Sequence, residues 1–247
     1  MNFPIFALRV SEFLKQFPLL HKGLRRVYCL FRPGIRFCVE KAFRDQSDIF
    51  VLKIGANDGV TNDPIGHYLL SDSRYRGVLV EPIPYYARLL LNNYGLTGRF
   101  TIEQVAIAAS SDVIKMYHVA ENASELLGKR FDVTPFRGIA SLDRNHLVKH
   151  LPAGYDCIIE EVSVESVTVK ELLKRNQIQQ IDLLHIDAEG YDRIILQQFD
   201  FNLLRPKIVL FERDQLNTAD QQAARGMMEN AGYQVKAVER DFLCLLE

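Results

Sequence analysis

Residues 49–59 read Ile-Phe-Val-Leu-Lys-Ile-Gly-Ala-Asn-Asp-Gly, an apolar run that leads directly into a turn punctuated by glycine. Five of the first six residues are apolar, which is typical of a strand buried on both faces of a parallel sheet. Gly55 and Gly59 would let the backbone turn tightly and approach a ligand closely. A dinucleotide-binding fingerprint needs glycine at positions 55, 57 and 60, where this chain has Gly, Asn and Val. The stretch therefore predicts the first strand and ligand-binding turn of an α/β sheet, without the fingerprint of NAD-dependent dehydrogenases.

A second signal follows the next apolar run, Gly-Val-Leu-Val-Glu at 77–81, which ends in Glu81 and is followed by Pro82. In a βαβ unit, the acidic residue that binds a nucleotide ribose follows the glycine turn by ~20 positions. Glu81 lies 26 positions after Gly55. An ionised carboxylate has two oxygens, which can accept hydrogen bonds from two ribose hydroxyls. Glu81 could instead be a surface residue at a strand end, but its combination with the glycine turn favours the ribose role.

A third signal is the segment Ile-Asp-Leu-Leu-His-Ile-Asp-Ala-Glu-Gly-Tyr-Asp at 181–192, a strand-like run that ends in Asp187 and Glu189. A further run, Lys-Ile-Val-Leu-Phe-Glu at 207–212, ends in Glu212. Ligands of open α/β sheets bind outside the carboxyl ends of the strands, so these carboxylates should lie together in one crevice. Each of them could also be only an N-cap or turn residue.

Taken together, the motifs Ile-Gly-Ala-Asn-Asp-Gly at 54–59, Val-Glu-Pro at 80–82 and Leu-His-Ile-Asp-Ala-Glu-Gly-Tyr-Asp at 184–192 resemble those of the FkbM-type methyltransferases. The resemblance covers about residues 48–246, and the Ile-Asp-x-Glu-Gly segment is its most specific part. It implies a Rossmann-like class I fold and transfer of a methyl group from S-adenosylmethionine (SAM) to a hydroxyl of a sugar, glycan or related natural product. The cofactor contacts that the resemblance implies are Gly55, Asn57, Asp58, Gly59, Glu81 and Ala106.

The resemblance also places Asp187 and Glu189 at the methyl-transfer site. An alcohol proton is hard to remove, so a base or a metal ion at the acceptor would help, and Asp187, Glu189 and His185 are the candidate catalytic residues. Strand alternation puts His185 on the same face as Asp187, although a hydrogen-bonded core histidine is the more common role for such a residue. Asp187, Glu189 and Glu212 could also bind Mg²⁺, because hard cations take oxygen ligands. The sequence does not decide between a base and a metal. Lys53 stands where many methyltransferases have an acidic residue, which leaves open how the methionine ammonium group would be held.

The alternation of strand-like and helix-like runs after residue 48 predicts a mainly parallel sheet with a terminal antiparallel hairpin. Strands are expected at 49–54, 77–81, 100–107, 181–187, 207–212, 233–239 and 241–246. Helices are expected from Asp63 to about Arg74, from Pro84 to Gly95, from a capping box at Thr168 and over about 218–231. The SAM-binding domain should then span 49–247, with residues 1–48 as a basic amphipathic helical extension. An insertion over about 108–166 contains two strand-like runs and the segment Ser-Leu-Asp-Arg-Asn-His at 141–146, which could reach the acceptor or be a plain mobile loop.

Composition excludes several classes of protein. The net charge of −1 argues against a globally basic nucleic-acid binder, and the four scattered cysteines include no C-x-x-C pair that would suggest a zinc or redox site. Reduced thiols in a cytoplasmic location are the expectation. Residues 1–48 carry nine Lys and Arg against four Asp and Glu, but no apolar run there approaches the ~18 residues of a membrane span. Contact of this segment with a membrane surface is conceivable, although packing on its own domain or over the active site is more common. The acceptor and the oligomeric state are not indicated.

Two other kinds of protein would share some of these features. A non-catalytic Rossmann-like domain could bind a nucleotide or a partner as a scaffold, but it has little need for carboxylates at three strand ends. An NAD-dependent oxidoreductase is disfavoured by Asn57 and Val60.

Overall fold

The computed structural model describes residues 34–128, 133, 136 and 138–246. The chain divides into two compact units, Met1–Lys41 and Ala42–Glu247. Residues 1–33 of the extension expected over 1–48 lie outside the described residues; the described part, residues 34–48, contains the helix α3, Ile35–Ala42. No helix in the described part of the chain is long and apolar enough to cross a membrane.

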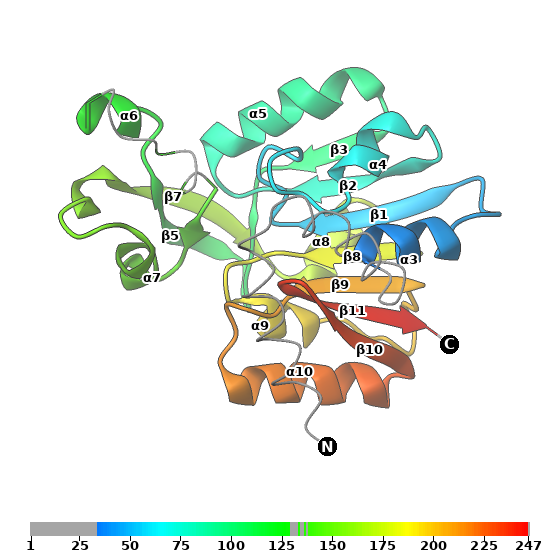
Figure 1. Ribbon diagram of the computed structural model, residues 1–247. Helices are drawn as coiled ribbons and strands as arrows, with labels where there is room; N and C mark the ends of the chain where they lie inside the picture. The colour runs from blue at the N-terminus through cyan, green and yellow to red at the C-terminus, as the bar shows by residue number, and fades with distance from the viewer. Residues whose placement is uncertain (1–33, 129–132, 134–135, 137, 247) are drawn as a thin grey trace, which may run out of the picture. The chain divides into compact units, whose positions relative to one another are not determined.

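A seven-stranded sheet forms the centre of the second unit (Figure 1), in the order β10-β11-β9-β8-β1-β2-β3. Five strands run parallel, and β11 lies antiparallel between β9 and β10. The strands are β1 (Ile49–Ile54), β2 (Tyr75–Val80), β3 (Phe100–Glu103), β8 (Leu183–Ile186), β9 (Ile208–Glu212), β10 (Tyr233–Val238) and β11 (Asp241–Leu246). This topology confirms the Rossmann-like, mainly parallel sheet with its terminal antiparallel hairpin.

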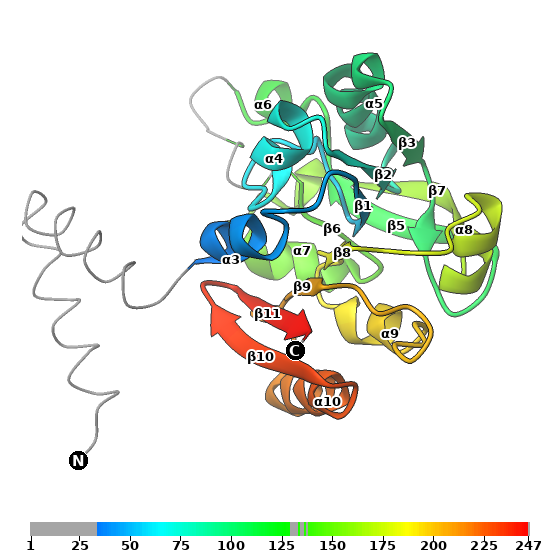
Figure 2. The same ribbon diagram turned by 90° about the vertical axis from the view of Figure 1, so that its right-hand side faces the viewer.

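The central strands are apolar because helices and loops cover both of their faces. All four residues of β8 and all five of β9 are buried, and alternate side chains of these strands, including Leu184, Ile186, Val209 and Phe211, pack in one core with side chains of β1 and β2. The covering helices are α4 (Gly66–Ser71), α5 (Pro84–Tyr94), α8 (Val169–Arg175), α9 (Asp192–Leu196) and α10 (Thr218–Asn230). Figure 2 shows α10 running alongside β10. Thr168 and Glu171 form the expected capping box of α8, in which each side chain binds the backbone N–H of the other residue.

Two expected elements differ from the structure. The run over 100–107 is not one strand: β3 ends at Glu103, and β4 (Ala106–Ile107) pairs with a different sheet. The helix expected from Asp63 begins only at Gly66, because the Asp63 carboxylate accepts the backbone N–H of Ile65 in a turn and also pairs with Lys53.

The second sheet is built mostly from the stretch that interrupts the alternating pattern. Its order is β4-β7-β5-β6, and β5 (Asp112–Val119) pairs antiparallel along its whole length with β7 (Ile159–Val167). The short strand β6 (Ala140–Ser141) and the helices α6 (Ala123–Leu126) and α7 (Arg144–His150) complete it. Figure 1 shows this sheet beside the carboxyl ends of the central strands. As a result, β6 and α7 face the cavity described below.

Candidate active site

A cavity of about 750 Å³ opens at the carboxyl ends of β1, β2, β8 and β9, where the second sheet forms its opposite wall. Crevices of this kind at the strand ends of an open α/β sheet are the usual place for a ligand. The polar residues that line it include Lys53, Asn57, Asp58, Asp63, Glu81, Ser141, Asp143, His146, His150, Asp187, Glu189, Glu212 and Arg240.

The loop after β1 is shaped by close contact with the end of β8. Gly55 has a φ of 77°, and a Cβ added to it would overlap the carbonyl oxygen of Asp187. Asn57 also has a positive φ, 50°, which is uncommon for a residue with a side chain. The loop therefore brings its backbone against the cavity at a point where only glycine fits.

Glu81 fixes this loop from the neighbouring strand. Its Oε2 accepts the backbone N–H of Asn57 at 2.8 Å, and its Oε1 accepts that of Ile83 at 2.9 Å. The residue is 4% exposed and lines the cavity, and burial raises the pKa of its carboxyl to about 7, against the opposing effect of the two backbone hydrogen bonds. Each oxygen has a second lone pair, so the carboxylate can still accept hydrogen bonds from a ligand.

The other residues expected to contact a cofactor are divided. Asp58 lines the cavity, but its carboxylate also accepts the backbone N–H groups of Val60 and Thr61 at 2.9 and 2.8 Å. Gly59 does not line it; a Cβ at Gly59 would overlap the ring of Tyr94, whose hydroxyl donates to the Gly59 carbonyl. Packing against Tyr94 thus accounts for this glycine. Ala106 lines the cavity from β4, within an apolar wall that also includes Tyr85, Tyr86, Leu89, Ile114 and Met116.

His185 does not line the cavity, so the structure does not support it as a base that contacts the acceptor. It is 1% exposed, and its Nδ1 accepts a hydrogen bond from Lys53 Nζ at 2.7 Å. Lys53 and His185 are register partners on the neighbouring strands β1 and β8, which puts them on the same face of the sheet. Burial and the Lys53 charge hold the pKa of His185 well below its usual value, so it is a neutral core residue. Lys53 also pairs with Asp63 at 3.2 Å.

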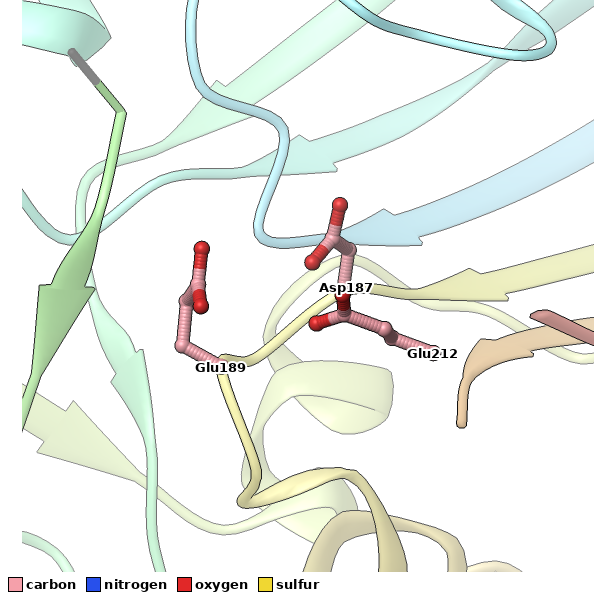
Figure 3. A group of neighbouring side chains, drawn as sticks. All are labelled: Asp187, Glu189 and Glu212. Atoms are coloured by element: carbon pink, nitrogen blue, oxygen red, sulfur yellow. The ribbon is translucent and has the colours of Figure 1, made fainter. Parts of the chain in front are cut away.

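Three carboxylates meet at the ends of β8 and β9, as the sequence predicts (Figure 3). One oxygen from each of Asp187, Glu189 and Glu212 lies within 4.8 Å of the others. Burial raises the pKa of the Asp187 carboxyl to about 6 and that of Glu212 to about 9, and repulsion between the carboxylates adds to both. Arg240 forms an ion pair with Glu212.

Asp192 supports this acidic group through hydrogen bonds to the backbone, a role that the sequence does not indicate. The side chain is fully buried and accepts backbone N–H groups from Ala188, Gly190 and Glu212. It therefore ties the loop after β8 to the end of β9. Burial raises the pKa of Asp192 to about 8. Its place at the end of the Asp-Ala-Glu-Gly-Tyr-Asp segment was the available signal.

Helix α7 contributes His146, which the sequence indicates only as part of a segment that could reach the acceptor. The Nε2 atom of His146 lies 3.4 Å from Oε2 of Glu189, and the ring centroids of His146 and His150 are 4.6 Å apart. Glu189 has a φ of 48°, a strained conformation of the kind found at ligand sites. The structure thus brings the insertion and the motif at 184–192 together, an association that residue spacing cannot show.

Similarity to known proteins indicates the family of this chain. The protein-family model described as methyltransferase FkbM domain matches residues 53–235. No curated protein gives a significant sequence match.

Similar solved structures include an FkbM methyltransferase from Methylobacillus flagellatus, at 10% identity and a TM-score of 0.48 over 81% of this chain and 43% of that one. They also include the Methanococcus jannaschii fibrillarin pre-rRNA processing protein, at 11% identity and a TM-score of 0.43 over 81% of this chain and 67% of that one. A SAM-dependent O-methyltransferase from Thermotoga maritima is similar at 10% identity and a TM-score of 0.38, over 90% of this chain and 70% of that one. The chain spans less than half of the Methylobacillus protein, and similarity this distant says nothing about substrates. The family model, which matches residues 53–235 and so most of this chain, shows that the chain belongs to the FkbM methyltransferase domain family.

Proposed function

We propose that this protein is a SAM-dependent O-methyltransferase that acts on a hydroxyl of a sugar, a glycan or a related natural product. The observation that carries the cofactor part is the position of Glu81, a buried carboxylate on the cavity wall that also fixes the glycine turn after β1. Family membership supports methyl transfer from SAM. The choice of a hydroxyl acceptor rests on the carboxylates at the ends of β8 and β9 and on family likeness.

The residues present fit SAM. Glu81 would accept the ribose hydroxyls with the free lone pairs of its two oxygens, and the Gly55 turn would approach the amino-acid portion with its backbone. The apolar wall around Tyr86 and Met116 offers an aromatic and aliphatic surface for the adenine ring of SAM or for a hydrophobic part of the acceptor. SAM, when bound, supplies a methyl group that its sulfonium sulfur has already activated. The protein then mainly needs to align the acceptor and to help its hydroxyl lose a proton.

In this proposal Asp187 acts on that proton. It follows the last residue of β8, beside the glycine turn and on the cavity wall. A base works best when its pKa lies near the working pH, and burial raises that of Asp187 to about 6. Asp187 would therefore either accept the hydroxyl proton or hold a cation that makes the hydroxyl more acidic. Glu189 and His146 would line the acceptor side of the same space.

A scaffold that only binds a nucleotide is the second candidate. It would bind the nucleotide through Glu81 and the glycine turn, and the carboxylates at the ends of β8 and β9 would then have no function. Holding three carboxylates within 4.8 Å of one another, with Glu212 buried, costs stability, and a site that performs no chemistry has no reason to keep them.

The test is transfer of labelled methyl from SAM to a panel of methyl glycosides and small polyketide alcohols, each compared with its deoxy or O-methylated analogue. The proposal expects a labelled O-methyl group on at least one acceptor, and no label on the analogue that lacks the free hydroxyl. Tight SAM binding without transfer to any hydroxyl would favour the scaffold.

A further inference from the structure

The geometry points to a binding site for one divalent, oxygen-preferring cation between Asp187, Glu189 and Glu212, with open coordination positions directed into the cavity. This inference deepens the proposed function and rests on it for its role, since the cation would hold the acceptor hydroxyl. The cation itself is argued from the three side chains and their neighbours.

The spacing of the carboxylates suits a single cation. Opposite ligands of a six-coordinate ion are separated by twice the metal–oxygen distance, about 4.0–4.2 Å for Mg²⁺ and 4.6–5.2 Å for Ca²⁺. One oxygen from each of the three side chains lies within 4.8 Å of the other two. Small side-chain rotations would therefore bring all three around one ion.

An independent observation is an orphaned oxygen. Glu212 is 4% exposed, and its Oε2 is buried without a hydrogen-bond partner among the described residues. Figure 3 shows the Glu212 carboxylate directed toward Asp187 and Glu189. A buried carboxylate oxygen without a donor is costly, so a group with positive charge is expected at this point.

Neighbouring side chains bind one oxygen of Glu212 and one oxygen of Glu189. Arg240 pairs with Oε1 of Glu212, and His146 contacts Oε2 of Glu189 at 3.4 Å. Second-shell hydrogen bonds of this kind orient ligating carboxylates in metal sites. No described residue donates a hydrogen bond to the side chain of Asp187. Lys53, the nearby buried cation, is already paired with Asp63 and His185.

Three protein oxygens leave about half of a six-coordinate shell for water and substrate. Because the site lies on the cavity wall, the open positions would take a hydroxyl oxygen of the acceptor, and two neighbouring hydroxyls could bind together. The expected acceptor is therefore an alcohol with a second oxygen close to the one that is methylated, as in a sugar diol.

The test is calorimetric titration of the chelator-treated full chain with Mg²⁺ and, separately, with Ca²⁺. We expect one ion per chain, and at least a tenfold weaker affinity in Glu212→Gln and in Glu189→Gln. Glu229→Gln is the matched control, because Glu229 is an exposed glutamate of α10 that does not line the cavity and pairs with Arg225. It should bind the cation as the wild type does. Unfolding curves without metal identify any variant that fails to fold, and Glu189→Gln, which alters a more exposed side chain, then decides.

The inference would be overturned if neither Mg²⁺ nor Ca²⁺ bound at millimolar concentration, or if the folded variants bound the cation with unchanged affinity. The same samples are titrated with SAM. Binding of SAM without a cation leaves the proposed function in place and removes the metal site. Binding of a cation without SAM removes the proposed function and leaves the site as a cation site of another role.

Discussion

The Oε2 atom of Glu81, at the end of β2, accepts the backbone N–H of Asn57 in the loop after β1 at 2.8 Å. One side chain thus shapes the glycine turn and presents its remaining lone pairs to the cavity. Loss of a charge-assisted pair of hydrogen bonds costs ~1.5–3 kcal/mol, so Glu81→Gln should weaken SAM binding by about one to two orders of magnitude. Calorimetry measures this change directly, and equal affinities would remove Glu81 from the cofactor site.

The protonation of Glu81 gives a second, pH-dependent prediction. Its pKa is about 7 in the folded protein and near 4.5 when unfolded, so the folded state binds more protons between these values. The contribution of Glu81 to the free energy of unfolding should be greatest below about pH 4.5 and should decline as the pH rises to 7. Urea unfolding at several pH values should show wild type losing stability relative to Glu81→Gln across this range. A constant difference between the two proteins would show that Glu81 is not held as the structure indicates.

Gly55→Ala tests the contact between the turn and β8. The new Cβ would overlap the carbonyl of Asp187, and a positive φ costs a residue with a side chain about 1–2 kcal/mol. Gly98→Ala is the control, because Gly98 also has a positive φ of 64° but no neighbouring atom where the Cβ would lie. Gly55→Ala should therefore be about 1–3 kcal/mol less stable than Gly98→Ala in urea unfolding. Equal stability would mean that the backbone approach at Gly55 has no steric consequence.

The start of the catalytic unit can be tested by a pair of shortened chains. The compact unit begins at Ala42, and Phe43 is fully buried with its ring edge-on to Tyr75. A chain that begins at Ala42 should fold and bind SAM. One that begins at Gln46 lacks Phe43 and should be about 3–5 kcal/mol less stable. If the two chains have the same unfolding midpoint, Phe43 contributes nothing to this core.

Much of this site could be predicted where the signal is local. The turn after β1, Glu81 and the carboxylates at the ends of β8 and β9 each follow an apolar strand, so their common edge follows from the topology of a parallel sheet. The pairing of Lys53 with His185 depends on the register between two strands far apart in the sequence. The position of His146 depends on how the second sheet packs, and the division of the run at 100–107 depends on pairing with β7. Such long-range contacts leave no periodic pattern in the sequence.

Asp187→Asn separates chemistry from cofactor binding. Asparagine keeps the shape of the side chain but loses the charge needed to accept a proton or to bind a cation. The variant should lower kcat by about 10²–10⁴-fold while the SAM dissociation constant changes only slightly. Treatment of the wild type with EDTA then divides the two roles: loss of activity that Mg²⁺ or Ca²⁺ restores indicates a metal, and full activity indicates a simple base. Near-normal turnover in Asp187→Asn would exclude both.

The most direct measurement of the central claim is a calorimetric titration of the unmodified protein with SAM and, in parallel, with NAD. The cavity between the Gly55 turn, Glu81 and Asp187 predicts one SAM bound per chain, and Asn57 and Val60 predict no comparable affinity for NAD. Tight binding of NAD, or no heat from SAM at concentrations far above those at which methyltransferases bind it, would contradict the account.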